Sequence, residues 1–119
     1  MMTLQHYHGG CQCGAVQYEV DVDLDRTLTC NCSRCQRLGT VLAFTAADKF
    51  MLQSGEGKLT EYLFNKHAIR HLFCAVCGIE SFAYGTMPDG APTVAINANC
   101  LDGVEPRQLK SHHYDGKNK

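Results

Sequence analysis

Eight of the 119 residues are cysteines, and seven of them lie in three short groups within residues 11–13, 30–35 and 74–77. Cysteines this close along a chain suit a shared metal ion, whereas disulfides require an oxidising compartment. Residues 1–8 lack the basic and apolar regions of a signal peptide, which favours metal binding. An exported chain with four disulfides and a removed signal is the alternative.

The overall composition describes one folded domain, which we predict to span residues 1–119 and to be cytoplasmic. Hydrophobic residues make up 45% of the chain and charged residues 19%, which is typical of a globular protein. The net charge is −1, from 11 basic and 12 acidic residues, so a nucleic acid is not an expected partner. No apolar run approaches the roughly 20 residues that span a membrane.

Apolar residues alternate with polar ones more often than they follow a helical period. The clearest half-buried strand is predicted from Val16, Tyr18, Val20 and Val22, and a weaker one from Ile69, His71 and Phe73. Further short strands are expected at residues 59–64, 81–84 and 93–96, whereas 33–38 and 46–50 have room for a turn or two of helix. The predicted fold is mostly β, with small antiparallel sheets and cysteines at the turns.

Two of the cysteine groups end in Cys-Gly, at Gly14 and Gly78. A glycine there allows a positive φ and turns backbone N–H groups towards the sulfurs. Two such turns supply four thiolates, which complete a closed tetrahedral Zn²⁺ site. We therefore predict one structural zinc bound by the four cysteines of these turns: Cys11, Cys13, Cys74 and Cys77. The alternatives are reduced cysteine turns without metal and an iron–sulfur site.

The middle group, Cys30, Cys32 and Cys35, has no following glycine and offers only three thiolates. Three ligands leave one position of a tetrahedral zinc open for water or substrate, which is the mark of a catalytic site. Zinc with three thiolates carries a charge of −1 rather than −2, so it repels an incoming thiolate less. The alternatives are a group of reduced thiols and a structural site closed by Cys100 or a histidine.

Residues near the middle group suggest how a substrate is held. Arg34 and Arg37 flank its end and are candidates to bind a carboxylate of an anionic substrate, although both may simply be solvated. Cys100 follows an apolar strand, where a lone cysteine is usually a small buried hydrophobe; a fourth ligand or a reactive thiol are the other interpretations. The six histidines form no recognisable zinc-finger or helical metal motif.

Three segments together resemble a known family: His8-Gly9-Gly10-Cys11-Gln12-Cys13-Gly14-Ala15-Val16, Cys30-Asn31-Cys32-Ser33-Arg34-Cys35 and Phe73-Cys74-Ala75-Val76-Cys77-Gly78. They are similar to the glutathione-dependent formaldehyde-activating enzymes, a family that also includes centromere protein V. The resemblance extends from about residue 8 to residue 116. Segments 78–82 and 96–102 look more like the centromere protein V branch. The resemblance therefore predicts the fold and the zinc sites of this chain better than it predicts the substrate.

The resemblance implies a zinc-bearing set of small β-sheets with two Zn²⁺ per chain. One zinc is structural, at the positions of Cys11, Cys13, Cys74 and Cys77; the other is labile or catalytic, at Cys30, Cys32 and Cys35. The family activity joins formaldehyde to glutathione as S-(hydroxymethyl)glutathione and is classed as a carbon–sulfur lyase.

Our hypothesis is a zinc-dependent carbon–sulfur lyase-like protein acting on glutathione or a similar small thiol and an aldehyde. The catalytic group would be the middle cysteines, with Arg34 and Arg37 binding the thiol cofactor. The alternatives are a non-enzymatic zinc module that binds proteins or thiols, and a redox or zinc sensor. The sequence does not predict an oligomeric state.

Overall fold

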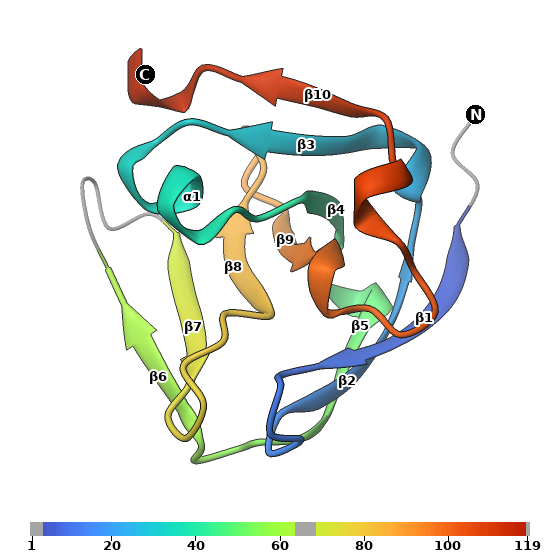
Figure 1. Cartoon of the computed structure of the whole chain (residues 1–119), viewed down its shortest axis with the longest axis vertical. Helices are drawn as coiled ribbons and strands as arrows, with labels where there is room; N and C mark the ends of the chain where they lie inside the picture. The colour runs from blue at the N-terminus through green and yellow to red at the C-terminus, as the bar shows by residue number, and fades with distance from the viewer. Residues whose placement is uncertain (1–3, 64–68, 119) are drawn as a thin grey trace.

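The computed structural model of the chain describes residues 4–63 and 69–118, which form two β-sheets (Figure 1). The smaller sheet has three strands in the order β1 (Gln5–Gly10), β2 (Gln17–Val22) and β5 (Phe50–Ser54). The larger sheet has seven, in the order β10 (Ser111–Tyr114), β3 (Thr27–Cys30), β4 (Leu42–Ala46), β9 (Pro92–Asn97), β8 (Phe82–Thr86), β7 (Arg70–Cys74) and β6 (Leu59–Tyr62). The mostly β prediction is confirmed.

Helical structure is short. The α-helix α1 spans Ser33–Leu38, and single 3₁₀ turns lie at Leu24–Arg26 (η1), Ala47–Lys49 (η2), Ala98–Cys100 (η3), Pro106–Gln108 (η4) and Gly116–Asn118 (η5). The helix predicted at 33–38 is therefore confirmed, and the one expected at 46–50 is a 3₁₀ turn. In the described residues no helix is long and apolar enough to cross a membrane.

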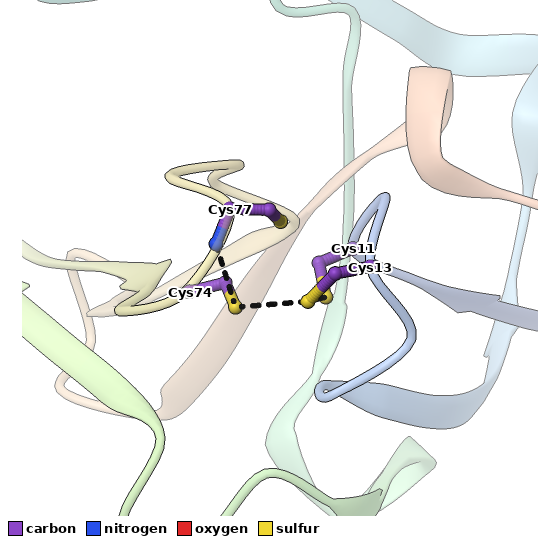
Figure 2. A group of neighbouring side chains, drawn as sticks. All are labelled: Cys11, Cys13, Cys74 and Cys77. Carbon is purple, nitrogen blue, oxygen red and sulfur yellow. Dashed lines mark hydrogen bonds between the residues drawn. The ribbon is translucent and has the colours of Figure 1, made fainter.

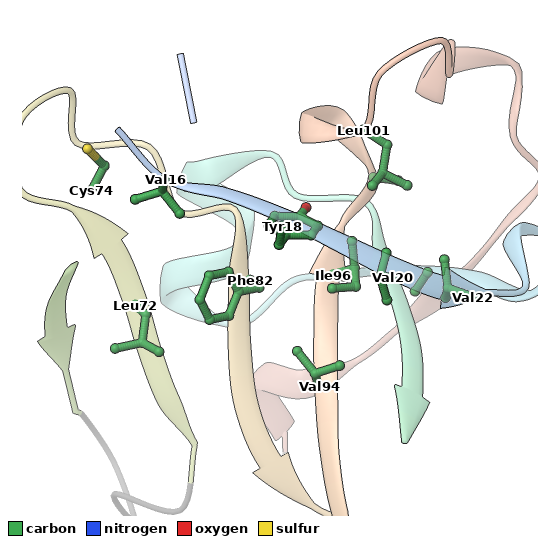
Figure 3. Packing of buried hydrophobic residues seen from close by; sticks show 12 residues of the cluster. Val16, Tyr18, Val20, Val22, Leu72, Cys74, Phe82, Val94, Ile96 and Leu101 are labelled. Carbon is green, nitrogen blue, oxygen red and sulfur yellow. The ribbon is translucent and has the colours of Figure 1, made fainter. Parts of the chain in front are cut away.

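Strand β2 supplies one side of the hydrophobic core. Tyr18, Val20 and Val22 are buried, while the residues between them lie towards the surface, as the alternating pattern predicted. Figure 3 shows these side chains packed against Phe82 and Ile96 of the larger sheet. Burying side chains of this size contributes about 1.5–3 kcal/mol each, so this contact helps to hold the two sheets together.

Aromatic rings fill the centre of the core. The ring centroid of Tyr18 lies 5.0 Å from that of Phe50 and 5.7 Å from that of Phe82, and the last two are 4.7 Å apart. The Tyr18 hydroxyl donates to the backbone carbonyl of Ser81 at 3.2 Å, which satisfies its polar end inside the core.

One strand pairing is parallel, in a fold that was expected to be mostly antiparallel. Strand β10 runs parallel to β3, with Ser111 opposite Thr27 and Tyr114 opposite Cys30. The pairing brings the C-terminal end of the chain against the start of α1. Other expected strands were found with shifted bounds: β6, β7, β8 and β9; residue 64 of the predicted 59–64 strand lies outside the described residues.

Candidate metal centres

The first cysteine group consists of Cys11, Cys13, Cys74 and Cys77, whose four sulfurs all lie within 4.8 Å of one another (Figure 2). The sulfur of Cys13 is 3.7 Å from that of Cys11 and 3.7 Å from that of Cys74. Two ligands of a tetrahedral zinc with Zn–S bonds of about 2.3 Å are about 3.8 Å apart. The four thiols are therefore already arranged at the spacing of a closed metal site.

The two turns that carry these cysteines are built as the glycines predicted. Gly14 and Gly78 have φ values of 86° and 82°, in the left-handed region that glycine adopts without strain. Backbone N–H groups point at the sulfurs: Val16 donates to Cys11 Sγ at 3.3 Å, and the Cys77 N–H lies 3.5 Å from Cys74 Sγ. These donors stabilise thiolates at both turns.

The thiols of this group cannot all ionise easily by themselves. The backbone N–H groups of Cys13 and Ile79 lower the pKa of the Cys77 thiol to about 6. The N–H of Ala15 also favours the Cys13 thiolate, but desolvation and the three neighbouring sulfurs outweigh it and raise that pKa to about 11. A bound divalent cation would remove this mutual repulsion, so the donor set fits a metal ion.

The second group, Cys30, Cys32 and Cys35, lies where β3 ends and α1 begins, and its three sulfurs are also within 4.8 Å of one another. Cys32 is the N-cap of α1: its sulfur accepts the Cys35 N–H at 3.3 Å. Although burial disfavours its thiolate, the Cys35 N–H and the other donors around it lower the pKa of Cys32. Burial raises the pKa of Cys35 to about 12.

Among the described residues, Cys100 joins neither group. It is partly buried, and its pKa is raised to about 12 by burial and then by the charges of Cys11 and Cys77. Within the described chain the middle group brings together three sulfur ligands, which leaves room for a fourth ligand from outside.

Arg34 and Arg37 line a surface groove of about 400 Å³ along α1, together with Tyr62. The Arg34 guanidinium donates to Glu80 Oε1 from Nε at 3.0 Å and from Nη2 at 2.7 Å, and lies 4.5 Å from the Tyr62 ring centroid. Arg37 is exposed and donates to the Ser33 carbonyl at 2.9 Å. The two arginines therefore differ: Arg34 neutralises a buried carboxylate, whereas Arg37 faces solvent.

Glu80 connects the helix to the large sheet. It is buried, and its second oxygen lies 3.4 Å from His71 Nδ1. His71 and Glu80 line a cavity of about 290 Å³ together with the three thiols of the middle group. Sequence analysis singled out neither residue as functional. The sequence signal that could have found Glu80 is its position at the start of an apolar strand. A carboxylate that is buried in such a place almost always has a charged or hydrogen-bonding partner.

The C-terminal segment also packs on the middle group. A Cβ at Gly116 would stand 2.6 Å from Cys30 Sγ, so only glycine fits there without displacement. Asn31 fastens the segment: its amide donates to Asp115 Oδ1 at 2.8 Å, and its own oxygen accepts the Lys117 N–H at 3.0 Å. This contact was not predictable from local sequence patterns, because the two segments are more than eighty residues apart.

The chain is similar to known proteins in both sequence and fold. A family model described as glutathione-dependent formaldehyde-activating enzyme matches residues 6–115, a range that contains both cysteine groups. The chain belongs to this family. A crystal structure of a protein from Rhodobacter sphaeroides is similar to this member of the formaldehyde-activating enzyme family, with 30% sequence identity and a TM-score of 0.79. The match covers 89% of this chain and 97% of that chain. The predicted resemblance is confirmed.

Proposed function

We propose that the protein is a carbon–sulfur lyase-like enzyme that joins a small thiol such as glutathione to an aldehyde. The observation that carries the proposal is the placement of the three middle thiols on the wall of a cavity that also exposes His71. A closed four-ligand site has no room for substrate, whereas a three-ligand site beside a cavity does. The family to which the chain belongs points to the same pair of substrates.

The donor set of each cysteine group fits zinc. Thiolates are soft ligands, and four or three of them at these spacings suit Zn²⁺. We assign one structural zinc to the first group and one catalytic zinc to the middle group. The ion at the middle group would supply Lewis acidity and an open position to a sulfur or a carbonyl oxygen.

The reaction itself is an addition that needs no oxidant. The thiol sulfur forms a bond to the carbonyl carbon, the C=O π bond breaks, and the thiol proton ends on the carbonyl oxygen to give a hemithioacetal. Glu80 fixes the ring of His71 through Nδ1, so His71 is our candidate to carry that proton across the cavity. Arg37, with Arg34 behind it, is placed to hold a carboxylate of the thiol in the groove along α1.

The test is the rate at which glutathione and formaldehyde exchange with their adduct, measured by two-dimensional exchange NMR with and without the zinc-loaded protein. The adduct also forms unaided, so the rate is the observable rather than the product. We expect faster exchange with the protein and no acceleration with the Cys32→Ser variant.

Cys32→Ser is a well-matched variant because serine is a good N-cap and can accept the Cys35 N–H in place of the sulfur. The helix should therefore persist while one thiolate is lost. Zinc content of the variant should fall from two ions to one, with the far-UV circular dichroism unchanged. An unaltered exchange rate with zinc-loaded wild-type protein would reject the enzyme and leave a zinc-binding module.

A further inference from the structure

The floor of the cavity beside the middle thiols is one row of residues across four adjacent strands. Phe44 of β4 pairs with Ala95 of β9, Ala95 with Ala83 of β8, and Ala83 with His71 of β7. Two methyl groups thus lie side by side between a phenyl ring and an imidazole. The cavity forms here because the two central positions of the row are alanines, whose methyl groups leave the space above the sheet unfilled.

The neighbouring row shows that the cavity is not a general feature of the sheet. One residue along each strand, Ala43 pairs with Ile96, Ile96 with Phe82, and Phe82 with Leu72, and all four belong to the hydrophobic core. Three of the four, Ile96, Phe82 and Leu72, are large side chains on the face that packs on the smaller sheet (Figure 3). On the face that the middle thiols share, the central β8 and β9 positions carry alanine, whereas on the core face they carry Phe82 and Ile96.

The walls and the mouth of the cavity are apolar. Leu28 and Leu42 line it, and Phe44, Ile69 and Tyr114 contribute side chains that are 39–49% exposed. Among the described residues that line the cavity, Glu80 carries the carboxylate, and Arg34 neutralises it. An apolar group that covers Ala83 and Ala95 therefore leaves water for an apolar lining.

The size of the cavity exceeds what formaldehyde requires. A water molecule occupies about 30 Å³ in the liquid, so a cavity of about 290 Å³ has the volume of roughly ten water molecules. Formaldehyde has two heavy atoms and would leave most of that lining wet. Glutathione carries charged groups along its length, which suit the arginine groove rather than this lining.

We propose that the cavity binds the apolar substituent of the aldehyde, so that the substrate class is short aliphatic aldehydes rather than formaldehyde alone. This inference rests on the proposed function and names the substrate of the same site. The aldehyde carbon would face the middle thiols and His71, and its alkyl chain would cover Ala83 and Ala95. The chemistry is the same balanced addition, with the thiol proton transferred to the carbonyl oxygen.

The test compares pentanal with formaldehyde, each with glutathione and zinc-loaded protein, as acceleration over the unaided exchange rate. Each methylene moved from water into the cavity should add about four-fold to the acceleration. Ala95→Leu should reduce the acceleration of pentanal by on the order of ten-fold more than it reduces that of formaldehyde. Ala46→Leu is the matched control, because Ala46 lies on the same strand face as Phe44 but outside this cavity and is exposed.

Binding is measured separately with pentan-1-ol, which has the alkyl chain but cannot react. Its titration should shift the amide NMR signals of residues 83 and 95 in the zinc-loaded wild-type protein and in the Ala46→Leu variant. The same two amides should not shift in the Ala95→Leu variant. If Ala95→Leu does not fold, Phe44→Ala at the exposed mouth replaces it and should lower the acceleration of pentanal alone.

The outcomes separate the two proposals. Equal acceleration of both aldehydes, or an equal effect of Ala95→Leu on both, would overturn the substrate class while the proposed function stands. Acceleration of neither aldehyde would overturn the function and the substrate class together, even if pentan-1-ol binds. Faster exchange of pentane-1-thiol with formaldehyde, lost in Ala95→Leu, would assign the cavity to the thiol and overturn the aldehyde assignment.

Discussion

Glu80 shows how one buried residue organises the site. Its carboxylate lies within hydrogen-bonding distance of the Arg34 guanidinium and close to His71, so it joins α1 to the large sheet. A buried carboxylate is costly unless it is paired, and Arg34 supplies the matching charge. The residue therefore couples the stability of the helix to the orientation of the cavity wall.

The first prediction compares this buried ion pair with an exposed one. Glu80→Gln leaves the guanidinium of Arg34, which is only 19% exposed, without its counter-charge, and we expect a loss of at least about 2 kcal/mol. Glu61→Gln removes the partner of Arg70, whose side chain is 56% exposed, and should cost less than about 1 kcal/mol. Urea unfolding of the zinc-loaded proteins measures both, and equal losses would show that Glu80 does not anchor the helix.

At the scale of elements, the turn after β1 depends on close backbone contact. A Cβ at Gly10 would lie 2.3 Å from the carbonyl oxygen of Val16. That same oxygen accepts the Cys11 N–H at 3.0 Å, and so closes the turn that presents the first two sulfurs. Gly10 is thus required by approach of the backbone and not by a positive φ.

The second prediction follows from this contact. Gly10→Ala must displace Val16 and distort the cysteine turn, which should cost about 1–3 kcal/mol and speed the loss of one zinc to a chelator. Gly85→Ala on β8 is the control, because its Cβ would find its nearest atoms at 3.9 Å. The control should be neutral or slightly stabilising. The two variants are compared by thermal unfolding and by zinc release to a coloured chelator.

Strands β1 and β2 are also joined by charge, which gives the third prediction. Hydrogen bonds to Glu19 and then Asp21 raise the pKa of His6 above its usual 6.5. Since the folded pKa is the higher one, the stabilisation is fully present below pH 6.5 and is lost as the pH rises through the folded value. The melting temperature of His6→Gln should fall below that of the wild type in mild acid and meet it in mild alkali. A difference that does not change with pH would argue for packing instead.

At the scale of the whole molecule, local sequence patterns predicted most of the strands, the helix and the grouping of the cysteines. Strand β2 and helix α1 were predictable because their patterns lie within six residues each. Strand β10 was not, because its four residues are all exposed and its partner β3 is far away in the sequence. The cavity was likewise hidden, since Ala83 and Ala95 become a floor only through the register of β8 and β9.

The two cysteine groups differ in what they join, and the last prediction depends on this difference. The first group connects the turn after β1 in the smaller sheet to the turn after β7 in the larger one. Structural zinc contributes roughly 10–16 kcal/mol in small peptides, which is comparable with the whole stability of a domain, roughly 5–15 kcal/mol. The middle group lies within a single segment, from the end of β3 to α1, so a metal bound there would not join the two sheets.

We therefore expect Cys13→Ser to unfold the protein and Cys32→Ser to leave it folded. Cys13 is exposed and its substitution leaves no cavity in the core, so unfolding would reflect the lost metal ligand. Zinc content and the dispersion of amide NMR signals check both variants. Folded Cys13→Ser protein with two zinc ions would contradict the structural role of the first group, and unfolded Cys32→Ser would show that the middle group is structural as well. The opposite fates expected of these two serine variants distinguish a metal that joins two sheets from a metal that faces a substrate cavity.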